Sequence, residues 1–178
     1  MNVKNKLVIV INGKGGVGKD AMCVALESAY AVKNVSAITP IKNIASQYGW
    51  NGEKDPKSRR FLAELKRVFV EYNDLPTKYL LEQYEEFLQD DHDIMVVHIR
   101  EKAEISKFIK GLRTPVVSLL VKRSAVDNAA KYGNSADDEV EKYNYDHVFY
   151  NDHSLEESSA RFVEFIKDIE KEIFGKIK

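Results

Sequence analysis

Glycines and a lysine close to the start of the sequence have the spacing of a phosphate-binding loop. Gly13, Gly18 and Lys19 fit the pattern G-x-x-x-x-G-K. Glycine suits this task because successive backbone N–H groups can turn inward around an anion only where no Cβ blocks the approach. Lysines add positive charge, and a helix that begins at the loop directs its N-terminal amides at the same anion. The residues predicted to bind nucleotide phosphates are Gly13, Lys14, Gly15, Gly16, Val17, Gly18, Lys19 and Asp20.

Asp20 occupies a position where such loops normally have Ser or Thr. A hydroxyl there would bind Mg²⁺ directly. A carboxylate adds negative charge beside a triphosphate, so it is tolerated only if a metal ion or a lysine such as Lys14 offsets that charge. We therefore predict that Asp20 contacts Mg²⁺, directly or through water. The alternative is that Asp20 is only an acidic residue in the first turn of a helix, where the helix dipole favours acids.

The segments on either side of the loop predict a strand and a helix. Residues 7–11 (LVIVI) have the pattern of a strand buried on both faces, and a helical apolar pattern follows the loop. Further apolar runs at 35–38, 93–99, 115–121 and 146–150 alternate with helical patterns. This alternation predicts an α/β fold, a P-loop three-layer sandwich with a five-stranded, mostly parallel sheet and helices on both faces. The length of 178 residues fits one domain covering 1–178.

An inserted helical segment, about 40–90, lies between the second and third predicted strands. Helix-start signals occur at Thr39-Pro40, where Thr39 can act as the cap, at Asp55-Pro56, and at 74–76. We predict that this segment forms the substrate side of the site. Aromatic residues expected to line the acceptor pocket are Tyr48, Trp50, Phe61, Tyr79 and Tyr84. Residues 124–144 are polar and weakly periodic, which predicts a mobile, lid-like flap.

The composition excludes several classes of partner. Lys and Arg number 27 against 28 Asp and Glu, for a formal charge of −1, so nothing in the overall charge indicates a nucleic-acid or membrane partner. The single cysteine, Cys23, cannot form an internal disulfide and is expected to be a small core residue. No apolar run is long enough for a signal peptide or a membrane span. We expect a soluble cytoplasmic protein, monomeric or homodimeric.

Polar and cationic residues are predicted at the carboxyl ends of the strands, where ligands bind in parallel α/β sheets. They include Arg100, Arg123 and Asn151. With these residues, the sequence resembles the P-loop nucleoside monophosphate kinases. More narrowly, it resembles the deoxynucleoside monophosphate kinases of phages and the phosphomevalonate kinases, whose loops also end in Gly-Lys-Asp. The likeness is carried by residues 13–20, 59–62, 98–101, 121–123, 145–146 and 151.

The resemblance implies transfer of the γ-phosphoryl group of ATP, with Mg²⁺, to a small phosphorylated acceptor, first of all a nucleoside or deoxynucleoside monophosphate. Lys19 would contact the β- and γ-phosphates. Arg100 and Arg123, at neighbouring strand ends, would clamp the acceptor phosphate and the moving phosphoryl group, since guanidinium groups bind phosphate in a bidentate way. The implied acceptor-binding residues are Arg59, Arg60 and Arg100, the implied catalytic residues are Lys19, Arg100 and Arg123, and Asn151 would lie beside the adenine.

Several of these residues have a simpler interpretation. Arg60, Glu64 and Arg67 have helical spacing and could form a solvated ion-pair face. Arg100 could pair with Glu104. His98 lies within a strand pattern. This position favours a hydrogen-bonded side chain in the core or in the wall of the site over a catalytic role.

Two other functional classes stay open. The run from Lys14 to Lys19 also matches the loop of the deviant Walker A ATPases, switches that act through protein partners and use the extra lysine across a dimer interface. That family expects Thr or Ser at position 20 and aspartate-bearing motifs that this sequence lacks. The other class is a catalytically silent nucleotide-binding module. The sequence does not determine the acceptor.

Overall fold

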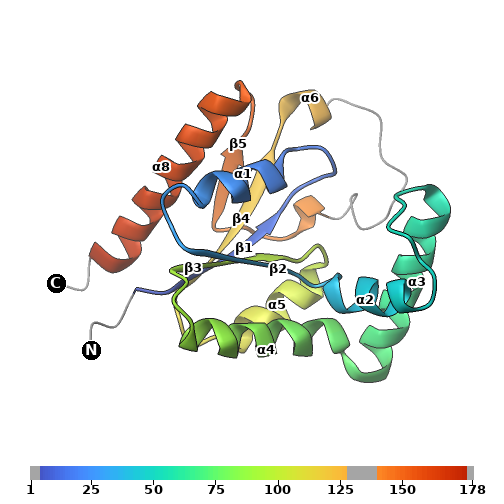
Figure 1. The fold of residues 1–178 in the computed structure, drawn as a ribbon. Helices are drawn as coiled ribbons and strands as arrows, with labels where there is room; N and C mark the ends of the chain where they lie inside the picture. The colour runs from blue at the N-terminus through green and yellow to red at the C-terminus, as the bar shows by residue number, and fades with distance from the viewer. Residues whose placement is uncertain (1–4, 128–139, 176–178) are drawn as a thin grey trace.

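The computed structural model describes residues 5–127 and 140–175, and their central element is a five-stranded parallel sheet (Figure 1). Its order is β2-β3-β1-β4-β5, and each pair of neighbours is parallel. The strands are β1 (Leu7–Asn12), β2 (Val32–Ser36), β3 (Ile94–His98), β4 (Val116–Lys122) and β5 (His147–Tyr150). The prediction of a five-stranded, mostly parallel α/β sheet is confirmed.

Strand β1 lies at the centre of the sheet because its side chains are apolar on both faces. All six of its residues are buried, as expected for a parallel strand covered on both sides. Val8 is aligned with Met95 of β3 on one side and with Val116 of β4 on the other. The carboxyl end of β1 therefore opens into the glycine loop between the ends of two other strands.

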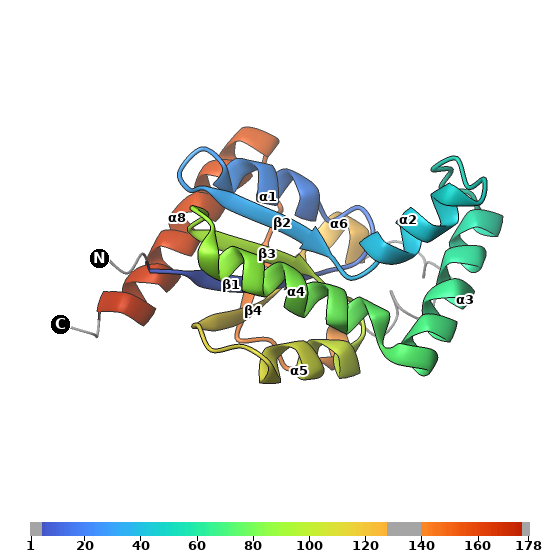
Figure 2. The same ribbon diagram turned by 60° about the horizontal axis from the view of Figure 1, so that its bottom comes forward.

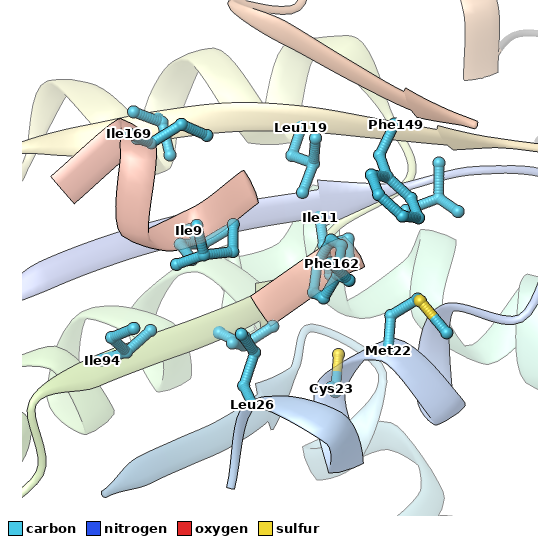
Figure 3. Close-up of a cluster of buried hydrophobic side chains, with 14 of the residues drawn as sticks. Ile9, Ile11, Met22, Cys23, Leu26, Ile94, Leu119, Phe149, Phe162 and Ile169 are labelled. Atoms are coloured by element: carbon cyan, nitrogen blue, oxygen red, sulfur yellow. The ribbon is translucent and has the colours of Figure 1, made fainter. Parts of the chain in front are cut away.

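Helices cover both faces of the sheet, which gives the three layers expected (Figure 2). Helices α1 (Lys19–Leu26) and α8 (Leu155–Phe174) pack on one face, while α4 (Leu75–Gln89) and α5 (Lys102–Lys110) pack on the other. In the first core, Ile9 and Ile11 of β1 meet Phe162 of α8 (Figure 3). Cys23 is buried in this core, as expected for a small core residue.

The segment between β2 and β3 contains α2 (Thr39–Gln47), α3 (Pro56–Asn73) and α4. Helices α2 and α3 project beyond the carboxyl ends of the strands in both views (Figures 1 and 2). Asp55 caps α3, because its carboxylate accepts a hydrogen bond from the Ser58 N–H at 2.7 Å. At the far end of the chain, the hydroxyl of Ser154 accepts from the Glu157 N–H at 3.3 Å and caps α8, as predicted.

Three expectations need correction. The second strand covers Val32–Ser36 instead of 35–38, because it is an edge strand whose residues are mostly half-exposed and therefore less apolar. Thr39 is not a helix cap, because Ile38 already has helical dihedral angles and occupies the cap position. Tyr84 does not line a pocket. It is fully buried in the core, and its hydroxyl accepts hydrogen bonds from the N–H groups of Arg113 and Thr114 at 2.9 and 3.1 Å.

The lid-like segment predicted at 124–144 lies mostly outside the described residues. Its described ends are the short helix α6 (Ser124–Asp127) and a 3₁₀ turn, η1 (Val140–Lys142). None of the helices in 5–127 and 140–175 combines the length and the apolar composition that a bilayer-spanning segment requires.

Candidate phosphate-binding site

The loop between β1 and α1 has the backbone conformation that its glycines suggest. Gly13, Gly16 and Gly18 have φ angles of 152°, 83° and 91°, in the region that favours glycine. Two of these positions also leave no room for a side chain. A Cβ on Gly13 would lie 2.5 Å from the carbonyl oxygen of Val121, and a Cβ on Gly18 would overlap the side-chain amide of Asn151. The loop is thus packed tightly against the ends of β4 and β5.

Lys19 folds back onto the loop from the first turn of α1. Its ammonium donates hydrogen bonds to the carbonyl oxygens of Gly13 and Lys14, at 2.5 and 2.9 Å. Val17 is buried in the core and anchors the middle of the loop, while Gly16 is exposed. The exposed glycine backbone and the lysine ammonium therefore belong to one short turn at the carboxyl end of the central strand.

Asn151 supports the loop from the end of β5. Its side-chain N–H donates to the Val17 carbonyl oxygen at 2.8 Å, and its backbone N–H donates to the Lys122 carbonyl oxygen at 2.8 Å. The side chain is almost fully buried. Contact between Asn151 and an adenine stays a prediction, whereas the hydrogen bonds show a residue that fixes the loop to β4 and β5.

Asn12 is a site residue that the sequence analysis missed. Its buried side chain donates to the Arg100 carbonyl oxygen at 3.0 Å and to the Tyr145 hydroxyl at 2.8 Å, and it accepts from the Gly13 N–H at 2.9 Å. Burial raises the pKa of Tyr145 to about 12, so its hydroxyl stays protonated and donates to the Val140 carbonyl oxygen. The signal in the sequence is a carboxamide that ends an otherwise apolar strand. Asn12 connects the start of the loop to the turn that carries Arg100.

The two strand-end arginines lie on either side of the loop. Arg100 follows β3 and Arg123 follows β4, and both are exposed. They were expected at neighbouring strand ends, but β1 lies between β3 and β4 in the sheet. The turn that holds Arg123 is fixed by Asp152, whose carboxylate accepts hydrogen bonds from the N–H and hydroxyl of Ser124 at 2.7 and 2.8 Å.

His98, at the end of β3, lies within the electrostatic field of the loop. Its Nε2 is 2.9 Å from Asn34 Oδ1. Burial lowers the pKa of His98; the charge of Asp20 opposes this effect, and the charges of Lys19 and Arg100 add to it. The ring is therefore neutral at physiological pH, and it agrees with the expectation of a hydrogen-bonded histidine in the wall of the site.

Cys23 lies near the same ring nitrogen, with its Sγ 3.7 Å from His98 Nε2. Burial raises the pKa of Cys23 to about 12, and the nearby charge of Asp20 adds to this effect. The thiol therefore stays protonated and acts as a core group, not as a nucleophile.

The two neighbouring arginines of α3 that were predicted to bind the acceptor, Arg59 and Arg60, lie on different faces of the helix. Arg59 precedes Lys66 by about two helical turns, so the two side chains share one face of α3, and Lys66 contacts the α5 turn next to Arg100. Arg60 lies on the outer face, in a shallow hollow with Phe61 and Glu64. Arg59, and not Arg60, thus shares a face of α3 with Lys66, and Arg59 is itself exposed. Glu104, a suggested partner of Arg100, pairs with Lys66.

Two lysines beside the loop share a carboxylate. Glu141, in η1, lies 3.1 Å from the ammonium of Lys14 and 3.3 Å from that of Lys122. The hydrogen bond from Lys14 lowers the pKa of Glu141, and Lys122 adds to the effect, so this carboxylate stays ionised near neutral pH. A negative charge is therefore held next to the loop that would bind phosphate.

Asp20 is exposed in the first turn of α1. Among the described residues, no group of three or more His, Cys, Asp or Glu side chains could hold a metal ion. A single carboxylate is compatible with Mg²⁺, because this ion is usually bound in nucleotide sites by one or two carboxylates together with phosphates and water. Asp20 fits that role, which stays a prediction.

The sheet order, the glycine loop and the helices on both faces together define the fold of the P-loop kinases. Solved structures share it over nearly the whole chain. They include the shikimate kinase from Aquifex aeolicus vf5, with a TM-score of 0.58 and 10% identity over 94% of this chain and 99% of that one. The gluconokinase from Sinorhizobium meliloti 1021 has a TM-score of 0.54 and 11% identity over 99% of both chains.

A third similar structure is TT1252 from Thermus thermophilus, with a TM-score of 0.54 and 18% identity over 93% of this chain and 98% of that one. No protein-family model and no curated protein matches the sequence. At these identities the similarity establishes the fold. The P-loop kinase-like fold implied by the resemblance is confirmed, and the narrower nucleoside monophosphate or phosphomevalonate type stays a prediction.

Proposed function

We propose that the protein is an ATP-dependent phosphotransferase that acts on a small acceptor. The observation that carries this proposal is the arrangement at the carboxyl edge of the sheet. A glycine loop ends the central strand, and the two strands that flank it end in Arg100 and Arg123. Phosphoryl transfer needs alignment of two reactants and neutralisation of charge more than covalent help from the protein, and this arrangement offers both.

The proposed roles follow from these positions. The N–H groups of the loop and of the first turn of α1 bind the β- and γ-phosphates, and Lys19 neutralises the charge that develops on the transferred group. Arg100 and Arg123 approach that group from the two sides of the loop. Asp20 holds Mg²⁺, which supplies charge neutralisation and alignment of the phosphate oxygens.

The proposed acceptor is a small phosphorylated molecule, first of all a nucleoside or deoxynucleoside monophosphate. The guanidinium groups of Arg100, after β3, and Arg59, on the face of α3 that carries Lys66, are proposed to bind one acceptor phosphate. Two of the similar structures are named as a shikimate kinase and a gluconokinase, which supports a small-molecule acceptor in general terms. Acceptors without a phosphate group therefore belong in the same screen.

The decisive experiment is a coupled assay of ADP release with ATP and Mg²⁺. The acceptor panel contains ribo- and deoxyribonucleoside monophosphates, phosphomevalonate, shikimate and gluconate. ADP release well above the background of hydrolysis with one phosphorylated acceptor is the expected result. If no acceptor raises the rate above background, the phosphotransferase proposal fails. If only shikimate or gluconate does so, the phosphorylated acceptor is wrong while the reaction class stands.

Arg59 and Arg60 provide a matched pair of variants on one helix. We expect Arg59→Ala to raise the acceptor KM about 10- to 100-fold, because a charge-assisted hydrogen bond contributes roughly 1.5–3 kcal/mol. Arg60→Ala removes the same group from the outer face and is expected to change this KM by less than about twofold. Steady-state kinetics at saturating ATP measure both. A larger effect of Arg60→Ala would place the acceptor in the outer hollow of α3.

Glu141 gives a prediction about nucleotide affinity. We expect Glu141→Gln to tighten ATP binding by about fivefold, because a partly exposed charge near a bound anion contributes on the order of 1 kcal/mol. Isothermal titration calorimetry at low and high salt measures the change, which should shrink with salt. The control is Glu85→Gln. It removes an exposed carboxylate of α4 that pairs with Arg113. Weaker binding by Glu141→Gln would mean that Glu141 holds Lys14 in its binding position.

The deviant Walker A interpretation receives less support. That class uses the extra lysine across a dimer interface, whereas Lys14 forms an ion pair with Glu141 of its own chain. ATP hydrolysis that rises with protein concentration and needs no acceptor would favour the switch. ATP binding without either activity would favour the catalytically silent module.

A further inference from the structure

A partly buried group of charges connects α3 to the turn that carries Arg100; within it Glu104 is buried, whereas the side chain of Glu101 is 41% exposed. The ammonium of Lys66, whose side chain is 12% exposed, lies 2.5 Å from Glu101 Oε2 and 2.8 Å from Glu104 Oε2. Glu101 follows Arg100 directly and is the N-cap residue of α5, while Glu104 lies in the first turn of that helix. One lysine from the segment between β2 and β3 thus contacts two carboxylates at the strand end proposed to bind the acceptor.

This arrangement is an inefficient way to stabilise a fold. Removing charges from water is costly, and replacing a buried ion pair by apolar side chains is often neutral or stabilising. Here two carboxylates share one ammonium, which leaves one negative charge uncompensated within the group when both are ionised. What a buried ion pair does provide is a fixed geometry, because its partners must meet within hydrogen-bond distance.

That geometry fixes the rotation of α3 as well as its position. Arg59 shares a face of the helix with Lys66, so the contact of Lys66 with α5 also determines the direction in which Arg59 points. A rotation of α3 by one residue, about 100°, would move Arg59 away from that face. A hydrogen-bonded ammonium restricts such a rotation more than an apolar contact does, because its partners must stay within hydrogen-bond distance.

We propose that Lys66, held by Glu101 and Glu104, is a positioning residue that orients α3 so that Arg59 faces the same acceptor site as Arg100. Lys66 does not contact substrate in this proposal and acts through α3. The inference deepens the proposed function and depends on it for the identity of the ligand. The contact between α3 and α5 can be tested without any activity.

The charge of the two carboxylates depends on pH. Burial raises the pKa of Glu104 to about 7; Lys66 opposes this shift, and the charge of Glu101 adds to it. Burial also acts to raise the pKa of Glu101, but Lys66 outweighs it and the pKa of Glu101 is lowered. Nearby charges include Arg100, directly before Glu101, and Lys107, one turn further along α5 and paired with Asp74. Below about pH 7 the pair carries one negative charge, which Lys66 balances.

The sign of the effect follows from the raised pKa of Glu104. Between its ordinary pKa of 4.5 and about 7, the folded protein keeps a proton that the unfolded chain releases. The stability contributed by Glu104 is therefore complete below 4.5 and is lost as the pH rises through about 7. Above that pH Glu104 ionises, and the stability is lost because a second charge is buried beside Glu101. The contact with Lys66 is not weakened by this step, because Lys66 lowers the pKa of Glu104 and so attracts the ionised carboxylate more strongly.

The first test is a set of α3 and α5 variants in the acceptor assay. We expect Lys66→Met to raise the acceptor KM by about 10- to 100-fold, since small displacements of a substrate-positioning group have effects of this size. The ATP KM should change by less than about twofold, and Lys66→Arg should recover part of the loss. Glu104→Gln, measured at pH 8, removes one charge from the contact with Lys66 and should raise the acceptor KM in the same direction. Lys57→Met, on the outer face of the same helix, is the control.

The second test needs no acceptor. Trp50 is the only tryptophan in the sequence, it follows α2, and α2 packs against α3. Its indole N–H is buried although the residue as a whole is half-buried, so its access to a quencher can still rise or fall. We expect acrylamide quenching of Trp50 to increase in Lys66→Met and, at pH 8, in Glu104→Gln. It should not increase in Lys57→Met. Circular dichroism confirms that each variant is folded.

Failure of this proposal and failure of the proposed function look different. Unchanged acceptor KM and unchanged Trp50 quenching in folded Lys66→Met would overturn the positioning role, while wild-type transfer would leave the function standing. If no acceptor is found for the wild type, the function fails, and the quenching of Trp50 still decides whether Lys66 fixes α3. If Lys66→Met does not fold, Lys66→Arg and Glu104→Gln carry both readouts.

Discussion

Lys19→Met is expected to lower phosphoryl transfer by about three orders of magnitude, the size seen when one preorganised charge-stabilising donor is removed from an active site. The reason is the position of the ammonium, which is held inside the loop by the carbonyl oxygens of Gly13 and Lys14. Methionine has a similar length but no charge. The effect should appear mainly in kcat, because the charge of the transferred group is greatest in the transition state.

Lys14→Met is the informative comparison, because it removes the other lysine of the same loop. Lys14 pairs with Glu141, so we expect its loss to reduce kcat by less than about tenfold, the scale of a screened surface charge. Rates are measured at saturating ATP and acceptor, with the fold checked by circular dichroism. Equal losses in the two variants would instead support the class of ATPases that depends on the extra lysine.

Gly13→Ala is expected to destabilise the protein by about 2–4 kcal/mol, as overpacking and strained backbone together usually do. Its φ angle is 152°, and the new methyl group would lie 2.5 Å from the Val121 carbonyl oxygen and 2.9 Å from Val17 Cγ2. The first of these atoms belongs to the backbone of β4 and cannot move without disturbing the sheet. Nucleotide affinity should fall together with stability, because the same turn forms the loop.

Gly15→Ala is the matched control for this substitution. A Cβ at Gly15 would meet no atom within 4 Å, so we expect a change of less than about 0.5 kcal/mol. Urea unfolding followed by circular dichroism measures both variants under identical conditions. Equal stabilities of Gly13→Ala and Gly15→Ala would contradict the packing of the loop against β4.

The features that were predicted correctly depend on neighbouring residues in the sequence. The apolar run of β1 ending in glycines, the Asp55-Pro56 start of α3 and the Ser154 cap of α8 each follow from residues within about one turn of each other. The edge strand β2 was placed three residues too late because Lys33 and Asn34 interrupt its apolar pattern. An edge strand covers less of the core and needs fewer apolar residues.

The arrangement of the site depends on contacts between distant residues, which a local pattern does not contain. Arg100 and Arg123 were recognised as strand-end residues, but the position of β1 between their strands follows from the sheet order. Asn12 and Lys66 were missed because a carboxamide at a strand end and a lysine on an amphipathic helix usually face solvent. The difference between Arg59, which shares a face of α3 with Lys66, and Arg60, which does not, also needed the orientation of that helix.

The hydrogen bond from Asn151 to the Val17 carbonyl oxygen joins residues 134 positions apart in the sequence. During synthesis the glycine loop leaves the ribosome long before the strand that supports it, because the chain emerges from its N-terminus. The amide that closes the loop arrives only when β5 has paired with β4. A nascent chain that ends before β5 therefore carries the whole glycine sequence without the support that shapes it, and the loop acquires its final form near the end of translation.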